Sequence, residues 1–419
     1  MMQRHRAAGV HMRRLFCLSS LLLLAAGSAG AARDWPQFFG PDRNGVYDGP
    51  PLAEAWGPGG PAAVWRTSVG QGLSGPVVAG NHLILFQRVA NREVVEAFDP
   101  RTGAKQWSYG YTTAYRDDFG FDEGPRAVPV VSNGVVYTFG AEGQLHAVEL
   151  ETGKRLWSED TMRRFKVPKN FFGSAGSPLV ENGRVLANIG GEKAGVVAFD
   201  ARTGAVLWTA TDDPASYSSA AGATINARRY AVFLTRTGLL GLDPATGAVR
   251  FQRRWRSRSA SSVNVATPIV IDDTIFVSAE YGPGAGVLRV NDGGLTELWT
   301  SDEVLSNHYA TSVYRDGILY GFHGRQEYGP SLRAVEYLTA KVRWSEEQFR
   351  AGSLVLAGDR LLILREGGEL VMAAASPDAF RPIARAQILP PTVRAYPALA
   401  DGLLYVRNDD TLICLDLRR

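Results

Sequence analysis

The chain has 419 residues, of which 45% are hydrophobic and 21% are charged, and it contains 46 glycines and 9 tryptophans. This composition is typical of a folded globular protein and excludes a long disordered chain. The formal net charge is +3, which is too small for a general electrostatic attraction to nucleic acid.

The segment 1–32 is predicted to be a secretory signal peptide. Arg13 and Arg14 precede an apolar run over residues 15–26, and the small residues that follow suit a cleavage site. The apolar run is shorter than the about 20 residues that a membrane-spanning helix needs. We therefore expect a single mature domain over residues 33–419, without a membrane span, in the periplasm or outside the cell.

Removal of the signal peptide changes the charge and the cysteine content. It takes four arginines and no acid from the 45 basic and 42 acidic residues, which leaves a net charge of about −1. Cys17 lies before most of the apolar run, whereas the cysteine of a lipoprotein would end such a run, so we expect no lipid anchor. Cys414 then remains alone in an apolar segment, and no internal disulfide is expected.

Two blocks of sequence recur along the rest of the chain. One is a proline followed by an apolar run. The other is a small residue, an apolar residue and an acid, followed by Thr-Gly, three further residues and a tryptophan. In chain order, the apolar runs begin at Pro76, Pro129, Pro178, Pro268 and Pro397, and the Thr-Gly turns begin at Thr102, Thr152, Thr203 and Thr246. One unit that recurs every 42 to 51 residues indicates stacked repeats.

Each repeat is predicted to contain four short strands. The proline-led run is the first strand, and a pair such as Asn133-Gly134 turns the chain into the second. The segment that ends in the acid is the third strand; the acid can accept backbone N–H bonds in the next turn, where the glycine supplies a positive φ. The tryptophan begins the fourth strand, where its ring can pack against the neighbouring repeat.

The aromatic anchors predict how many repeats there are and how they close. They stand 42 to 51 residues apart, at Trp65, Trp107, Trp157, Trp208, Phe251, Trp299 and Trp344. Degenerate units follow at 354–375 and 397–416, and the last unit has no anchor, while Trp65 has no unit before it. Pairing the Trp65 strand with the last unit would leave no exposed sheet edge. We therefore expect an all-β fold, one eight-bladed β-propeller, in place of the two or three domains that length alone suggests.

The repeats resemble those of the bacterial PQQ-binding-like β-propeller proteins, a family related to the quinoprotein alcohol dehydrogenases and to the outer-membrane assembly factor BamB. The leader Asp34-Trp35-Pro36-Gln37-Phe38-Phe39-Gly40-Pro41 and the pair Asn44-Gly45 carry the resemblance together with the repeats. It covers roughly residues 34–416. It implies the propeller fold, but it implies no single function, because one fold hosts many activities.

Two links between repeats carry dense charge. The link 115–123 holds four acids, which suit either a calcium site or a solvated loop that pairs with its neighbour. That neighbour, 163–172, interleaves four cations with aromatic residues. It could hold an anionic partner or a planar ligand, or it could pair with the acidic link. A second basic link, 253–258, has the same alternatives.

Residues just before the inner strands are expected to face the central channel, on the side where the longest links gather. They are the candidates for ligand or cofactor binding: Arg126, Ser174, Asn264, His308, Tyr309 and Tyr396. His308 is the candidate for acid–base work because its charge changes near neutral pH, and a structural hydrogen-bonding role is the alternative. His323, Arg325, Glu327 and Tyr328 form a polar group in a loop on the same side.

The resemblance implies two functions. A quinoprotein dehydrogenase usually carries an adjacent cysteine pair, calcium ligands and a catalytic aspartate, and this chain has no Cys-Cys and no aspartate placed before an inner strand. Neither a Gly-x-Ser-x-Gly motif nor a phosphate-binding glycine loop is present. We therefore expect an exported, non-catalytic scaffold that binds a protein or another envelope component, with no cofactor and no metal. A PQQ-dependent oxidoreductase, or a protein that binds PQQ with calcium, is the alternative.

Overall fold

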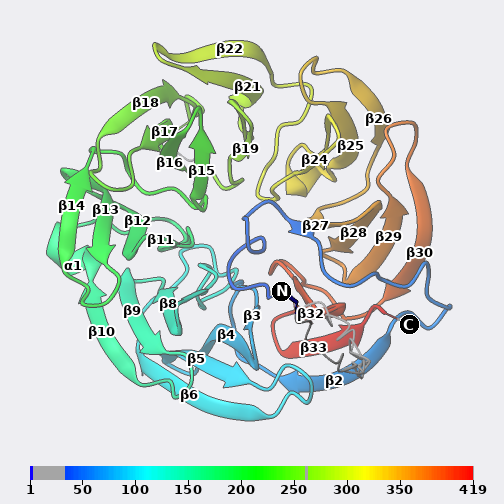
Figure 1. Cartoon of the computed structure of the whole chain (residues 1–419), viewed down its shortest axis with the longest axis horizontal. Coiled ribbons are helices and arrows are strands. Elements are labelled where there is room, and N and C mark those ends of the chain that lie inside the picture. Colours follow the sequence, from blue (N-terminus) through cyan, green and yellow to red (C-terminus); the bar gives the residue numbers. More distant parts are fainter. Residues whose placement is uncertain (3–33, 260–262, 419) are drawn as a thin grey trace. The chain divides into compact units, whose positions relative to one another are not determined.

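Each repeat folds into a four-stranded antiparallel sheet, and eight such sheets surround a centre as the blades of a β-propeller (Figure 1). This computed structural model describes residues 1–2, 34–259 and 263–418. The predicted fold class is thereby confirmed. The predicted signal peptide lies almost wholly outside the described residues and stays a prediction. Within the described parts, no helix combines the length and the apolar character needed to cross a membrane.

The first blade shows how the repeat folds. Its two middle strands are buried and its outer strand is half exposed. Asp99 accepts hydrogen bonds from the N–H groups of Arg101 and Thr102, and Gly103 adopts a φ of 72°. The predicted turn chemistry therefore forms as expected. The strands are β3 (Val77–Ala79), β4 (His82–Val89), β5 (Arg92–Phe98) and β6 (Lys105–Thr112).

The second, third and fourth blades follow in chain order. Their strands are β7 (Val130–Ser132), β8 (Val135–Phe139), β9 (Gln144–Glu149) and β10 (Arg155–Asp160); β11 (Leu179–Glu181), β12 (Arg184–Gly191), β13 (Ala194–Asp200) and β14 (Val206–Ala210); β15 (Ala221–Ile225), β16 (Arg228–Leu234), β17 (Gly238–Leu242) and β18 (Val249–Arg254). The short helix α1 (Thr161–Phe165) begins the link after β10.

The fifth, sixth and seventh blades complete most of the ring. Their strands are β19 (Ile269–Ile271), β20 (Thr274–Ala279), β21 (Gly284–Asn291) and β22 (Gly294–Ser301); β23 (Val313–Arg315), β24 (Ile318–His323), β25 (Ser331–Glu336) and β26 (Val342–Glu346); β27 (Gly352–Ala357), β28 (Arg360–Arg365), β29 (Glu369–Ala374) and β30 (Arg381–Gln387). The 3-10 turn η1 (Gln326–Tyr328) lies between the second and third strands of the sixth blade.

The last blade closes the ring as predicted. Strands β31 (Ala398–Ala400), β32 (Leu403–Arg407) and β33 (Thr411–Asp416) come from the C-terminal end, and β2 (Ala62–Ser68) is the outer strand. In the antiparallel pairing of β2 with β33, Trp65 lies opposite Cys414. The lone cysteine is therefore a buried thiol in the core of this blade.

The tryptophan anchors lie at equivalent positions between blades. The indole N–H of Trp65, Trp107, Trp157, Trp208, Trp299 and Trp344 each donates to a backbone carbonyl of the next blade. The first four rings also lie against the glycine of the next Thr-Gly turn, where an added Cβ would come within 2.7 Å of the ring. The repeated glycine thus serves the turn and leaves room for the neighbouring ring.

Candidate functional site

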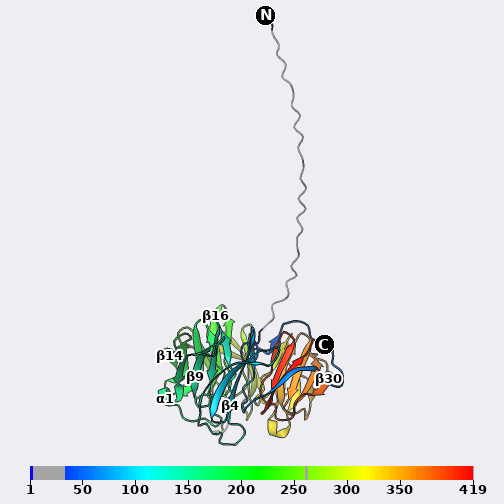
Figure 2. The same ribbon diagram turned by 90° about the horizontal axis from the view of Figure 1, so that it is seen from below.

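A cavity of about 610 Å³ opens at the centre of the ring. It lies on the loop face, which we define as the side that carries the links between blades and the loops between second and third strands. We call this cavity the funnel. Side chains of both kinds of connection line it, including Gln326 of η1, and η1 (yellow) projects from the lower side of the ring in Figure 2.

Four phenylalanines from two links form one side of the mouth of the funnel. Phe119 and Phe121 follow β6, whereas Phe171 and Phe172 follow α1. The ring centroids of Phe119 and Phe172 are 5.3 Å apart, and those of Phe119 and Phe171 are 6.0 Å apart. Phe119 and Phe121 remain 55% and 63% exposed. We call these four residues the phenylalanine rim; two neighbouring links thus present apolar rings to solvent.

The carboxylates of the acidic link are used within the protein. Asp117 accepts hydrogen bonds from the N–H groups of Phe119, Phe121 and Asp122 and pairs with Arg126 at 3.1 Å. Burial acts to raise the pKa of Asp117, but these hydrogen bonds and the Arg126 charge lower it overall. Asp118 pairs with a lysine of the basic link. The two links therefore pair, as one alternative predicted, and no group of three or more His, Cys, Asp or Glu suited to a metal ion occurs among the described residues.

Three arginines lie around the funnel, and each is held by one carboxylate. The pairs are Arg126 with Asp117 at 3.1 Å, Arg325 with Glu327 at 3.0 Å and Arg394 with Glu366 at 2.7 Å. Each guanidinium also lies over an aromatic ring, with centroid distances of 5.4 Å to Phe172, 4.6 Å to Tyr281 and 5.9 Å to Phe121. The carboxylates and rings fix the arginines in place but use only part of their five N–H groups.

His308 lies in the funnel but is held by two hydrogen bonds. The Gln326 backbone N–H donates to His308 Nδ1 at 3.3 Å, which assigns the ring proton to Nε2, 3.0 Å from the Tyr281 hydroxyl. Burial lowers the pKa of His308, so the neutral ring is favoured near pH 7. This arrangement matches the predicted structural alternative better than it matches a general acid or base.

The structure brings four of the six predicted channel residues together in the funnel: Arg126, His308, Tyr309 and Tyr396. Tyr309 donates to Glu366 at 2.8 Å. Ser174 and Asn264 are buried and do not line the funnel. The side-chain amide of Asn264 donates to the carbonyls of Thr235 and Trp255, so this residue ties its link to the fourth blade.

The leader contributes to the funnel, a feature that no pattern in the sequence indicated. Phe38 lines the funnel and packs edge-on against Tyr396 at 4.8 Å. The buried guanidinium of Arg43 donates to the carbonyls of Pro178 and Ala220, which precede the inner strands of the third and fourth blades. Burial lowers the pKa of Arg43 to about 9.

The leader also pairs with other blades. The backbone of Trp35 pairs with that of Val78 in β3, and the carbonyl of Pro36 accepts from the N–H of Val131 in β7. The leader then forms strand β1 (Val46–Tyr47), which adds in parallel to the inner edge of β27. Its contacts thus reach inner strands from several blades.

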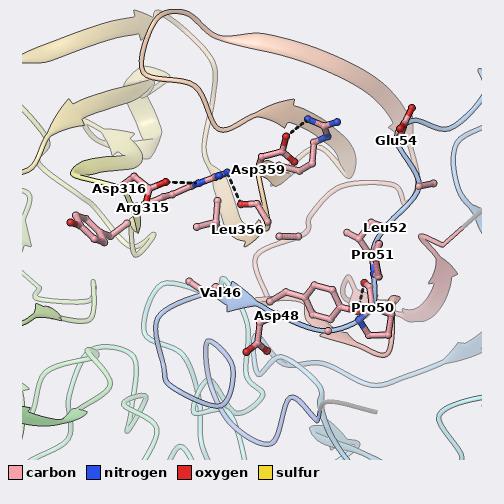
Figure 3. A pocket seen from close by; sticks show the side chains of 17 residues that line it. Val46, Asp48, Pro50, Pro51, Leu52, Glu54, Arg315, Asp316, Leu356 and Asp359 are labelled. Atoms are coloured by element: carbon pink, nitrogen blue, oxygen red, sulfur yellow. Dashed lines mark hydrogen bonds and ion pairs between the residues drawn. The ribbon is translucent and has the colours of Figure 1, made fainter. Parts of the chain in front are cut away.

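A second hollow, of about 880 Å³, lies beside the leader between residues 46–54 and the hairpin turns of the sixth and seventh blades (Figure 3). Its charges are largely paired with sequence neighbours. Arg315 bonds Asp316 at 3.1 Å, and Arg360 bonds Asp359 at 3.0 Å. We therefore place the candidate site at the funnel, where arginines and exposed aromatic rings meet.

Comparison with known proteins gives related families. A family model described as "Outer membrane protein assembly factor BamB" matches residues 91–322 and 252–419. The protein with that name from Burkholderia pseudomallei (strain K96243) is 26% identical over 318 residues, which cover 73% of this chain and 74% of the relative. The quinohemoprotein alcohol dehydrogenase ADH-IIG of Pseudomonas putida is 32% identical over 145 residues, which span 33% of this chain but only 20% of the relative.

Solved structures resemble this fold at low sequence identity. BamB from Moraxella catarrhalis superposes with a TM-score of 0.61 at 15% identity, over 84% of this chain and 97% of that structure. Quinohemoprotein alcohol dehydrogenase from Comamonas testosteroni superposes with a TM-score of 0.65 at 16% identity, over 93% and 81%. These likenesses concern the fold alone, since proteins of different activity share it.

Proposed function

Because this chain belongs to the family of the outer membrane protein assembly factor BamB, we propose that it is an exported, non-catalytic propeller that presents its loop face to a protein or another component of the cell envelope. Its work would be to bind and position a partner rather than to transform a substrate. A role in the assembly of outer membrane proteins is the form of this function that the names of the relatives suggest.

The phenylalanine rim is the observation that carries the proposal. Two of its rings are more than half exposed, at 55% and 63%, on links that are otherwise held by ion pairs and backbone bonds. Exposed aromatic clusters beside arginines are typical of the centre of a protein interface. A rigid loop face with such a patch supports recognition of a partner that covers these rings.

The funnel offers less support for oxidation. Its histidine is committed to two hydrogen bonds, and the carboxylates Glu327 and Glu366 are each paired with an arginine. Aromatic walls and arginines would suit a planar anion such as PQQ, but a calcium ion needs several carboxylate oxygens, and these two are already engaged. The residues of the funnel thus fit the organic part of that cofactor and not its metal.

Export to the periplasm is part of the proposal. The predicted signal peptide over residues 1–32 supports it, as does the assembly of outer membrane proteins that the relatives' names state. Fractionation of cells that produce the full chain tests this part directly. We expect the processed chain in the periplasmic fraction, and an unprocessed chain in the cytoplasm would contradict it.

The binding role can be tested with a surface variant of the rim. We expect Phe119→Ser with Phe121→Ser to lose the envelope proteins that co-purify with the tagged chain after cross-linking, at an unchanged melting temperature. The matched control is Leu156→Ser with Leu207→Ser, because these side chains are 47% and 48% exposed on outer strands. Equal recovery of partners from the rim variant, the control and the parent chain would contradict the proposal.

A further inference from the structure

We propose that the funnel takes a polypeptide segment in which an aromatic side chain stands next to a carboxylate. The carboxylate could belong to an acidic side chain or to a chain end, and both would make the same contacts. This inference rests on the proposed function, because it names the chemistry that the loop face would recognise.

The shape of the funnel sets the first condition on its occupant. Phe38 lines the funnel, and the rest of the leader pairs with the inner strands β3 and β27. With these residues at the centre of the ring, we expect a polypeptide to insert an end, a loop or single side chains from the loop face. A volume of about 610 Å³ has room for a few side chains.

The charge of the funnel sets the second condition. Arg126 has a side chain only 10% exposed, and its Nη1 atom is buried without a hydrogen-bond partner among the described residues. Arg325 Nε is likewise buried and has no hydrogen-bond partner within the described parts of the chain. A buried donor left unpaired is costly, and a carboxylate matches a guanidinium geometrically. These two nitrogens have almost no exposed surface, so a ligand carboxylate would pair with the exposed parts of the two guanidinium groups, whose side chains are 10% and 30% exposed.

The apolar lining sets the third condition. Phe172 lies under the Arg126 guanidinium and also approaches Tyr217, with ring centroids 5.5 Å apart. An aromatic side chain inserted here would meet ring edges and the face of a guanidinium, both of which favour another ring. The carboxylate and the ring must be close together, because Arg126 and Phe172 are in contact.

The exposed rings favour a polypeptide over a small molecule. Phe119 and Phe121 extend the apolar surface beyond the cavity onto the open loop face. A small ligand within the funnel would cover only the parts of these rings that line it, whereas a chain that continues out of the mouth would cover their exposed parts as well. The link that carries Phe119 and Phe121 also carries Arg126, so one segment of the ligand could contact both the rim and this cation.

Calorimetric titration of the mature protein with unlabelled peptides tests the inference, since an aromatic dye would itself enter the funnel. Two acetylated peptides separate the sources of the carboxylate: Gly-Ser-Gly-Asp-Phe with an amidated end, and Gly-Ser-Gly-Ser-Phe with a free end. Their controls replace Asp by Asn or amidate the free end. We expect each carboxylate-bearing peptide to bind about 10- to 100-fold more tightly than its control, because the control lacks one charge-assisted pair of hydrogen bonds to an arginine.

Variants show whether the binding occurs in the funnel. Arg126→Gln should remove the preference for the carboxylate, whereas Arg228→Gln, an exposed arginine on the hairpin of the fourth blade, should retain it. If Arg126→Gln fails to fold, Ala175→Trp fills the funnel without changing a charge and should abolish binding. Circular dichroism and the melting temperature establish that each variant is folded.

Two results would overturn the inference. One is equal binding of the acid and neutral peptides, or no binding of either by the folded parent protein. The other is PQQ binding that is tighter than that of any peptide and is lost in the same variants, which would favour a small planar anion. Loss of envelope partners in the rim variant, together with no peptide binding, would leave the proposed function standing and refute only this inference.

Discussion

Removal of the Trp157 ring should cost a large part of the stability of the propeller. Trp157 is 8% exposed between the second and third blades, with its ring against Gly204 and its indole N–H 2.9 Å from the carbonyl of Ala201. Replacing a buried tryptophan by alanine removes apolar contacts and leaves a cavity, which costs about 3–5 kcal/mol. We expect Trp157→Ala to lower the free energy of unfolding by that amount.

A conservative variant separates the ring from its hydrogen bond. Trp157→Phe keeps much of the apolar contact, and the Ala201 carbonyl still accepts from the Tyr137 hydroxyl at 3.1 Å. The loss should therefore be smaller, about 1–2 kcal/mol. Leu156→Ala, at the exposed neighbouring position, should stay within about 0.5 kcal/mol of the parent protein.

Urea unfolding followed by far-ultraviolet circular dichroism measures these differences without depending on tryptophan emission. We expect the free energy of unfolding to increase from Trp157→Ala to Trp157→Phe to the parent protein. A loss below about 1 kcal/mol for Trp157→Ala, at the scale expected of a surface position, would refute the assignment of the anchors as contacts between blades.

Three further predictions concern titration, the leader and the cofactor. Burial, with a smaller effect of Arg155, lowers the pKa of His146 to about 4. The neutral ring therefore contributes fully to the stability of the folded protein above pH 6.5, and this contribution is lost as the pH falls toward 4. Over that range the free energy of unfolding of the parent protein should fall by about 3 kcal/mol relative to that of His146→Phe, measured by urea unfolding at each pH. Arg43→Met should cost about 2–4 kcal/mol, because two buried carbonyls lose a charged donor, and limited proteolysis should then cleave the leader earlier than in the parent protein. PQQ with calcium should leave the melting temperature unchanged and should confer no dye-linked alcohol oxidation, whereas a ligand at 100 times its dissociation constant would add about 2.7 kcal/mol; a calcium-dependent rise lost in Arg126→Gln would contradict this.

The repeats predicted the architecture because their signals are local. A Thr-Gly turn and the tryptophan four residues after its glycine act within one blade and its neighbour, so the count of blades and the closure by Trp65 could be predicted without long-range information. The leader could not be predicted in this way. Trp35, Phe38 and Arg43 make their contacts with residues 43 to 358 positions away, and no periodic pattern in the sequence specifies them.

The candidate site was predictable only in part. Arg126 and His308, each just before an inner strand, line the funnel, because the repeat fixes that position. It did not distinguish Asn264, whose short amide side chain turns to the backbone carbonyls of Thr235 and Trp255 at the fourth blade. The phenylalanine rim was not predicted as a unit, because its members come from two links that meet only in the folded ring, through contacts such as the ion pair between Lys169 and Asp118 and the packing of Phe119 against Phe172.

Site-specific photo-cross-linking in living cells tests most directly the claim that the loop face binds an envelope partner. A benzoyl-phenylalanine in place of Phe121 probes the rim, and the same residue in place of Ile383, which is partly exposed on the outer strand β30, probes the circumference. The proposed function predicts a discrete cross-linked protein from position 121 and none from position 383. No cross-link from position 121, or the same product from both positions, would contradict it.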